Sequence, residues 1–212
     1  MTSTSTSGAV VRVPQAERTA VTRQRLMEAT IGCLVKYGWS GTTTMLVSEQ
    51  AGVSRGAMLH HFPSKLDLVV AAVEHLMHRR VEELEARVET LPKRGRTRAA
   101  LDLAAEHFTS DVFMAALELW VAARTDESLK AAVVPLERQV GLRAHQFAAN
   151  ILGIDESLGD NRALIQGTLD MLRGLGLAAA LTDDSKRRAF ILDAWATVLE
   201  SAVEATEGEA KR

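Results

Sequence analysis

Helical periodicity runs through almost the whole chain and constrains the fold more than any other feature. From about Glu17, the apolar positions Leu26, Cys33, Leu34 and Tyr37 recur at steps of three and four residues, which is the spacing of one face of an amphipathic helix. Later segments repeat this spacing, and no segment has the strict alternation typical of a strand. The sequence therefore predicts an all-α fold of about nine helices.

Glycines and hydroxyl side chains mark where the first helices begin and end. The first helix is expected from about Glu17 to Gly38, because glycine suits the left-handed conformation of a C-terminal cap. Thr43 or Thr44 is placed to cap a short second helix, and Gly52 stops it.

A third short helix and a long fourth one follow. Ser54 is placed to cap a helix that runs to His61, and Pro63 ends it because the residue before a proline is pushed out of the helical region. Segment 64–91 begins with a variant of the capping box and is expected to be one long helix. Segment 92–96, PKRGR, is the expected boundary between structural units.

Five more helices are expected beyond this boundary, separated by short polar breaks. Their expected ranges are 97–108, 112–124, 128–152, 162–181 and 185–205.

Charge is distributed unevenly along the chain. The net charge of −2 gives no indication of a nucleic-acid partner. Residues 1–66, however, carry seven basic and three acidic side chains, for a net charge of +4, which leaves −6 on the remainder. A basic head on an acidic body is a modest electrostatic footprint for a polyanion.

The sequence predicts a cytoplasmic protein without a membrane partner. Its apolar stretches are broken by charge before the roughly 20 residues that a bilayer span requires. The opening residues have no long apolar region or cleavage site typical of a secretory signal. Cys33 is the only cysteine, so an intramolecular disulfide is excluded, and its apolar neighbours predict that it is buried.

Residues 52–65, GVSRGAMLHHFPSK, combine polar side chains with core residues in one short helix. At 100° per residue, Arg55, Leu59 and His60 share an arc of about 140° with Gly56, whereas Met58 points elsewhere and can anchor the helix. Two short helices joined by a glycine-bearing turn form a helix-turn-helix unit, whose second helix can enter the DNA major groove.

The residue types on this face suit DNA. An arginine near the start of the helix can donate two hydrogen bonds to guanine, and a glycine allows close approach of the backbone. Hydroxyls, helix starts and a lysine are suited to phosphates. The predicted DNA-binding residues are Thr43, Thr44, Ser54, Arg55, Gly56, Leu59, His60, His61 and Lys65.

Residues 23–70 resemble the DNA-binding domain of the TetR (tetracycline repressor) family of transcriptional regulators. The matching residues are Gly38, Gly41, Thr42, Thr43, Val47, Ala51, Gly52, Val53, Ser54, Gly56, Ala57, His61, Phe62, Ser64 and Lys65. Two positions depart from the family pattern and leave the operator sequence open. Leu59 stands where the family commonly has an aromatic residue, and Met45 where a basic or polar residue is common.

The resemblance implies a homodimeric regulator, most simply a repressor that leaves palindromic double-stranded operator DNA when a small molecule binds. The expected domains are a disordered arm (1–16), a three-helix DNA-binding domain (17–66) and a helical ligand-binding and dimerisation domain (67–212). Repressor and activator cannot be distinguished from the sequence.

Apolar side chains of the larger domain are candidates for an effector cavity, although each is individually typical of an ordinary core. The predicted ligand-binding residues are His107, Phe108, Phe113, Leu117, Trp120, Val121, Arg124 and Phe147. Arg143 and His145 are further polar candidates, and the expected effector is largely apolar.

The last two expected helices carry the features of a subunit interface. Gly167, Gly174 and Gly176 allow close helix approach, and the final helix has a long apolar stripe that includes Trp195. Two such helices from each of two subunits would form a four-helix bundle; the alternative is that these faces pack within one chain.

Other classes of function have weaker support. The sequence has no glycine-rich phosphate loop, activated serine elbow or paired cysteine and histidine, so no catalytic residue or cofactor is expected. His75 and His78 are a candidate metal pair, but a solvated face is the better interpretation and no metal is predicted. The rival hypothesis is a helical small-molecule-binding protein without a role in gene regulation.

Overall fold

A computed structural model describes residues 15–210, and this part of the chain forms nine α-helices and no β-strand, which confirms the all-α prediction. The helices are α1 (Gln15–Gly41), α2 (Thr44–Ala51), α3 (Arg55–His61), α4 (Lys65–Val88), α5 (Arg96–Phe108), α6 (Asp111–Ala123), α7 (Glu127–Leu152), α8 (Asn161–Ala179) and α9 (Ser185–Ala210).

Helix α1 differs from the expectation at both ends. It begins at Gln15, so two residues of the expected arm are helical; the rest of that arm, residues 1–14, lies outside the described residues. At its other end, Gly38 has φ 66° and breaks the helix near the expected point, after which one more turn leads to Gly41. The Thr42 hydroxyl donates to the Gly38 carbonyl at 2.8 Å and holds this turn.

The three expected N-caps are confirmed. The side chains of Thr43, Ser54 and Ser64 each accept a hydrogen bond from the backbone N–H three residues further on, at 3.2, 3.2 and 3.1 Å. Gly52 ends α2 in the left-handed conformation with φ 65°. Local chemistry therefore fixes the bounds of both helices of the helix-turn-helix unit.

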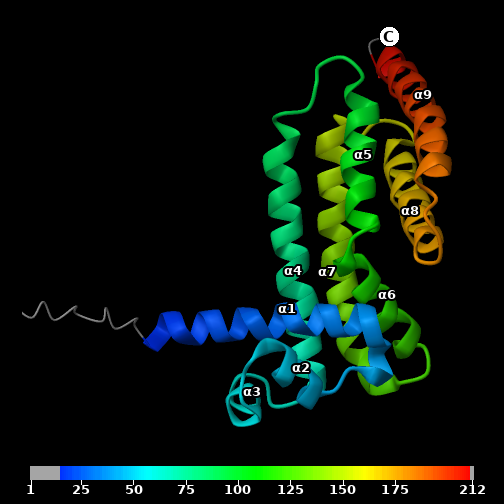
Figure 1. Ribbon diagram of the computed structural model, residues 1–212. Coiled ribbons are helices and arrows are strands. Elements are labelled where there is room, and N and C mark those ends of the chain that lie inside the picture. Colours follow the sequence, from blue (N-terminus) through cyan, green and yellow to red (C-terminus); the bar gives the residue numbers. More distant parts are fainter. Residues whose placement is uncertain (1–14, 211–212) are drawn as a thin grey trace, which may run out of the picture.

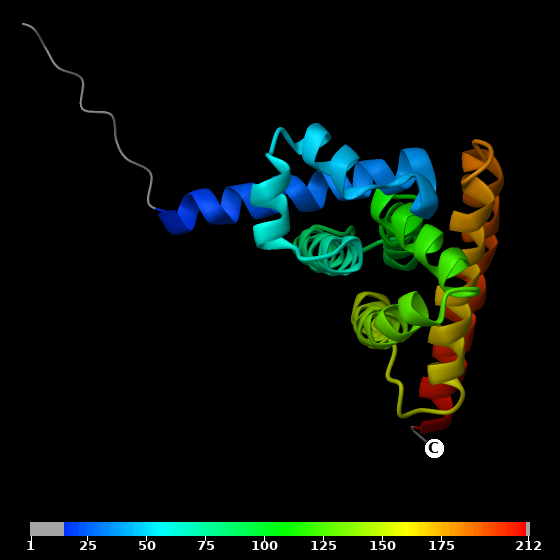
Figure 2. The same ribbon diagram turned by 90° about the horizontal axis from the view of Figure 1, so that it is seen from below.

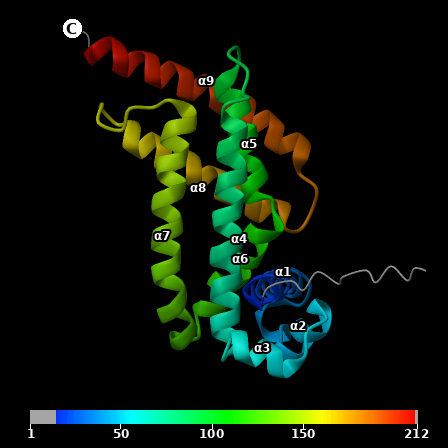
Figure 3. The same ribbon diagram turned by 90° about the vertical axis from the view of Figure 1, so that its left-hand side faces the viewer.

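Most of the helices form a bundle, and α1 lies across one end of it. Helices α4, α5 and α7 stand side by side, and α8 and α9 cover the bundle next to α5 (Figure 1). Helix α1 runs across the end of the bundle where α4 begins, and it packs against α4 and α6. Helices α2 and α3 lie on the outer side of α1, at the far end from the C-terminus (Figures 1 and 3).

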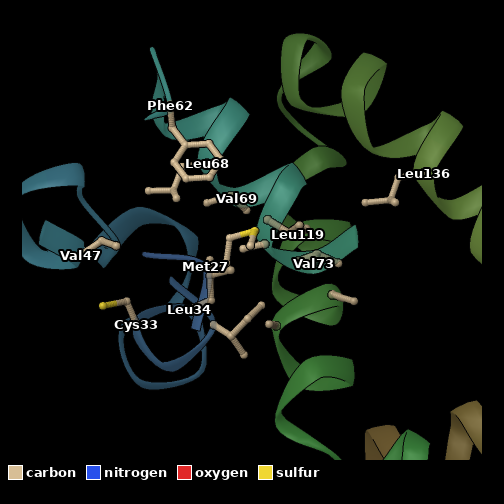
Figure 4. Packing of buried hydrophobic residues seen from close by; sticks show 14 of the residues in the cluster. Met27, Cys33, Leu34, Val47, Phe62, Leu68, Val69, Val73, Leu119 and Leu136 are labelled. Atoms are coloured by element: carbon tan, nitrogen blue, oxygen red, sulfur yellow. The ribbon is translucent and has the colours of Figure 1, made fainter. Parts of the chain in front are cut away.

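One buried apolar cluster joins the helix-turn-helix unit to the bundle. Figure 4 shows side chains from α1, α2, α4 and α6 gathered in it, among them Leu34, Val47, Val73 and Leu119. The cluster extends to Leu136 of α7. Helix α4 belongs to both parts of the molecule, because its side chains pack in this cluster with those of the helix-turn-helix unit and of α7.

A second buried cluster joins α8 and α9 to α5 and α6. Here Gly176 lies so close to α5 that a Cβ atom would be 2.2 Å from the carbonyl oxygen of Phe108. Trp195 of α9 donates through its indole N–H to the hydroxyl of Thr168 at 3.0 Å. This packing fixes α8 and α9 against the bundle while leaving their outer faces uncovered.

Candidate functional site

Helix α3 has one buried and one exposed face, as the spacing of its residues predicts. Met58 is completely buried, whereas Arg55, Gly56, Leu59 and His60 are exposed. Leu59 is 42% exposed although it is a large apolar residue. The helix therefore presents an arginine, an apolar side chain and an imidazole on one surface, together with a glycine that allows close approach of the backbone.

Contacts on its buried face hold α3 in place. Val47 of α2 and Met58 of α3 belong to the same buried cluster, and the Val53 amide donates to the Ser48 carbonyl at 2.9 Å across the turn. Phe62 closes α3 and is 2% exposed. The recognition surface is thus a rigid element and not a loop.

The hydroxyl side chains that are expected to contact phosphate differ in their exposure to solvent. Thr43 and Ser54 are exposed, Thr44 is half-buried, and the two capping hydroxyls accept hydrogen bonds from amides. A hydroxyl that accepts in this way still has a proton to donate. Both caps can therefore hold their helices and donate to phosphate together.

Lys65 has an internal partner that the sequence did not indicate. Its ammonium donates to the backbone carbonyl of Trp39 and lies 3.9 Å from the centroid of the Trp39 ring. Burial lowers the pKa of this lysine. Lys65 therefore fastens the start of α4 to the last turn of α1, and its expected phosphate contact remains a prediction that requires a second hydrogen bond from the same ammonium.

His61 lies at the edge of the recognition surface. It is half-buried, and burial, followed by the charges of His60 and Arg23, lowers its pKa. Arg23 of α1 lies with its guanidinium carbon 4.4 Å from the centroid of the Phe62 ring. His61 therefore supplies a neutral ring at pH 7, and positive charge beside it comes from α1.

A narrow cavity of about 50 Å³ lies between α4, α5 and α7, with Leu169 of α8 in its wall. Its apolar lining includes Met77, Val81, Phe108 and Phe147. Five polar residues also line it: Glu74, His78, His107, Gln139 and Arg143. Because ligand pockets usually occupy about 300–1,000 Å³, a molecule of ordinary effector size fits only if the surrounding helices separate.

His107 on α5 has an unusual environment in this cavity. Its Nδ1 atom is buried and has no hydrogen-bond partner among residues 15–210. Burial, followed by the charges of Arg80 and Arg173, lowers its pKa from 6.5 to about 4. The imidazole is therefore neutral at pH 7.

The structure brings three of the predicted ligand-binding residues to this cavity, namely His107, Phe108 and Phe147. Phe113 is buried behind Phe108, with the two ring centroids 5.3 Å apart. Trp120 is half-buried on the far side of Phe113, with a centroid distance of 6.0 Å.

The remaining three predicted ligand residues lie on α6 or, for Arg124, at its C-cap, and none of them lines the cavity. Leu117 is half-buried, Val121 is 57% exposed, and Arg124 is exposed. Helix α6 turns its buried face to α1 and α7, so its other faces do not meet the cavity. His145 is also placed elsewhere: its Nε2 atom is 3.0 Å from Glu156 in the groove between α7 and α8. These four residues do not line the cavity between α4, α5 and α7.

Sequence reasoning missed the α4 and α7 walls of the cavity. Met77, Val81 and Leu84 of α4 have helical spacing, and so do Leu136 and Val140 of α7. That spacing is the same for residues that fill a core and for residues that surround a cavity, so the sequence contains no distinguishing feature.

Helices α8 and α9 expose large apolar side chains on their outer faces. Leu177 of α8 is 55% exposed, Phe190 and Val198 of α9 are 75% and 47% exposed, and Leu181 in the connection between the two helices is 90% exposed. Gly167 and Gly174 are exposed on α8, with no atom near their Cβ positions. Gly176, in contrast, faces α5 within the chain, so only two of the three glycines stay free for contact with another subunit.

No helix of residues 15–210 combines the length and apolar character needed to cross a membrane. Among the same residues, no three His, Cys, Asp or Glu side chains form a group that can hold a metal ion.

These features define a class of protein: an all-helical molecule with an N-terminal helix-turn-helix unit joined to a helical bundle that contains a small cavity. Residues 26–72 match the model of the bacterial regulatory proteins of the tetR family. The HTH-type transcriptional regulator CymR of Pseudomonas putida is 33% identical over 178 residues, covering 83% of this chain and 88% of that protein. The chain belongs to the TetR family of transcriptional regulators, which confirms the resemblance.

Other relatives agree with this assignment. The HTH-type transcriptional repressor AcnR of Corynebacterium diphtheriae is 29% identical over 108 residues, or 51% of this chain and 53% of that protein. A crystal structure of a transcriptional regulator from Pseudomonas aeruginosa has the same fold, with a TM-score of 0.67, 24% identity and coverage of 92% of this chain and 96% of that one. The transcriptional regulator FadR of Bacillus subtilis, in complex with stearoyl-CoA, has a TM-score of 0.61 and 15% identity, with coverage of 82% and 96%.

Proposed function

We propose that this regulator is a homodimeric repressor that binds a palindromic operator and releases it when a small, largely apolar molecule enters the cavity between α4, α5 and α7. The observation that carries the proposal is the division of α3 into a buried face anchored by Met58 and an exposed face with Arg55, Gly56, Leu59 and His60. A helix held in this way can enter the major groove without rearrangement.

The contacts have separate roles in this proposal. Arg55 reads guanine through two hydrogen bonds, which contributes about 1–3 kcal/mol of discrimination between bases. Leu59 contacts a thymine methyl group, and the exposed Met45 at the start of α2 adds apolar surface. Thr43 and Ser54 donate to phosphates, and these contacts set the register of the protein on the duplex.

Release follows from the size of the cavity. An effector that needs more than the available 50 Å³ binds better when α4 moves away from α5 and α7. Because α4 also belongs to the core of the helix-turn-helix unit, that movement changes the separation of the two α3 helices in the dimer. A ligand with higher affinity for one of two states shifts the population towards it.

The proposal also covers catalysis and the location of the protein in the cell. Transcriptional regulators of this family act by binding, so we infer that the protein has no catalytic residue and needs no cofactor. A DNA partner also places its action in the cytoplasm. The repressor assignment is supported by the name of the relative AcnR, and the ligand-controlled release by the complex of FadR with stearoyl-CoA.

Substitution of Arg55 tests the proposal. Arg55→Ala should weaken binding to the DNA that flanks the gene by about 1–3 kcal/mol, because a base-reading contact is lost, and should affect random DNA much less. Gel-shift titrations with both duplexes measure the two losses. The exposed Arg124 on α6 provides the control, since Arg124→Ala should leave both affinities unchanged. Equal losses on both duplexes would show that Arg55 does not read bases.

A further inference from the structure

The polar residues of the cavity fall into two groups. Glu74 and His78 on α4 are half-buried, and Gln139 and Arg143 on α7 are exposed, so these four side chains reach solvent and form the mouth. His107 is the one polar residue that α5 contributes to the lining, and it lies between the apolar neighbours Ala104 and Phe108. The mouth contains one acidic and one basic side chain, Glu74 and Arg143, whereas α5 contributes only the imidazole of His107, a half-buried residue whose Nδ1 atom is buried.

The imidazole of His107 lacks a protein partner. Its Nδ1 atom is buried without a hydrogen bond among the described residues, which is unfavourable for a polar group. Buried polar atoms are nearly always satisfied by protein, water or ligand. The unsatisfied nitrogen therefore indicates that a bound molecule completes this end of the cavity.

Two arginines act electrostatically on His107, although burial is the larger cause of its lowered pKa. Arg80 of α4 and Arg173 of α8 both act on His107 through their charge and lower its pKa. The Nε atoms of the same two arginines are buried without partners among residues 15–210. A potential that repels a proton from His107 attracts a negative charge to the same place.

Each of these arginines is paired with two carboxylates. Arg80 has ion pairs with Glu83 at 3.5 Å and Glu106 at 3.6 Å. Arg173 pairs with Asp170 at 2.5 Å and reaches Glu137 at 3.9 Å. These contacts occupy the terminal nitrogens of the guanidinium groups and leave Nε unpaired in each case.

We propose that the cavity binds a small, largely apolar carboxylic acid, with its carboxylate against His107 and its apolar part between α4 and α7. This inference rests on the proposed function, because it identifies the class of effector for the same cavity. His107 touches the ligand, and Arg80 and Arg173 are positioning residues that stabilise its charge through the low-dielectric interior. The apolar wall of Met77, Val81 and Phe147 accommodates the remainder of the molecule.

Matched probes test the head group independently of the tail. Octanoate is compared with octan-1-ol and octylamine, and naphthalene-2-carboxylate with 2-naphthylmethanol, by calorimetric titration of the full chain at pH 7 without DNA. At least one acid should bind about tenfold more tightly than its alcohol, and the amine more weakly than both. Acids that bind no better than their alcohols, or a complete lack of acid binding, would overturn the proposal.

Variants locate the carboxylate. His107→Phe keeps a ring beside Phe108 and should abolish the preference for acids, whereas His78→Phe at the mouth should retain it. Arg143→Gln should also retain it; loss of the preference in this variant alone would place the carboxylate at the mouth and refute the assignment to His107. Circular dichroism checks the fold of each variant.

A second pair of variants covers the case in which His107→Phe does not fold. Arg80→Met should weaken acid binding and leave alcohol binding unchanged, and Arg79→Met, its exposed neighbour, should change neither. Equal effects of the two substitutions would contradict the electrostatic argument. The calorimetric titrations contain no DNA, so they test the class of ligand alone. An acid that binds but does not release the operator in a gel shift would refute the proposed function and leave the ligand class intact.

Discussion

Gly38 is the residue at which the long first helix stops and the helix-turn-helix unit begins. Its φ of 66° lies in the left-handed region, which L-residues with a side chain adopt only with strain. A Cβ atom there would also meet a carboxylate oxygen of Glu118 at 2.9 Å. Since the glutamate side chain is flexible, the backbone conformation is the main reason for glycine at this position.

Gly38→Ala is therefore predicted to lower the free energy of unfolding by about 1–2 kcal/mol. Gly32→Ala is the matched control in the same helix, because no atom lies within 4 Å of its Cβ position and Gly32 is in the helical interior. The control should raise stability by about 0.5–1 kcal/mol. Urea denaturation at one protein concentration measures both changes, and an unaltered midpoint for Gly38→Ala would contradict the strain argument.

Single residues were predictable from the sequence where their role depends on near neighbours. The caps Thr43, Ser54 and Ser64 interact three residues away, so their positions alone indicated them. Lys65 and His107 depend on partners distant in sequence. The Trp39 carbonyl that binds Lys65 is 26 residues away, and the arginines around His107 come from two other helices, so neither environment was visible in the sequence.

At the scale of elements, α3 separates stability from recognition within seven residues. Met58→Ala should destabilise the protein by about 2–5 kcal/mol, because the residue is completely buried. Leu59→Ala should change stability by less than about 0.5 kcal/mol and still weaken operator binding, since Leu59 is exposed on the recognition face. Thermal unfolding and gel shifts on both variants test the division; similar stability losses would disprove the assignment of faces.

Helix α8 depends on Gly176 for its position against α5 and α6. Gly176→Ala should destabilise the protein by about 1–3 kcal/mol or more, because the new Cβ atom would clash with the carbonyl oxygen of Phe108, and backbone cannot rotate away as a side chain can. Gly141→Ala on α7 is the control, with no atom within 4 Å, and should be neutral or stabilising. Denaturant titrations distinguish the two, and a neutral Gly176→Ala would mean that α8 can shift at little cost.

The order and bounds of the helices were largely predictable, because periodicity and caps are local. The contents of the cavity were predictable only in part, because periodicity indicates which residues are apolar but not which helix each face meets. Val121 and Arg124 follow Trp120 in an apolar stretch, yet α6 turns that side outward. The cavity instead uses α4 and α7, whose apolar residues could equally have filled a solid core.

At the scale of the whole molecule, exposed apolar side chains lie on α8, on α9 and in the connection between them, although Val121 of α6 and Val134 and Leu142 of α7 are also exposed. Leu177, Leu181, Phe190 and Val198 are all about half exposed or more, whereas their helices are otherwise well packed against α5. The helix-turn-helix unit lies at the opposite end of the bundle from the C-terminus (Figure 1), and α1 extends beyond α2 and α3 (Figure 2). A dimer formed through α8 and α9 would therefore leave α3 of each subunit uncovered.

The protein should sediment as a dimer at micromolar concentration, and Phe190→Asp should make it a monomer. The substitution puts a charge in the middle of an apolar contact, where stable interfaces bury about 800 Å² on each partner. Val134→Asp on α7 is the control, because Val134 is similarly apolar and 52% exposed but lies outside α8 and α9.

The monomeric variant should also lose operator affinity, since two recognition helices about 34–36 Å apart are needed to meet successive major grooves. Sedimentation velocity and gel shifts measure both properties, and a Phe190→Asp protein that remains dimeric would exclude this face as the interface.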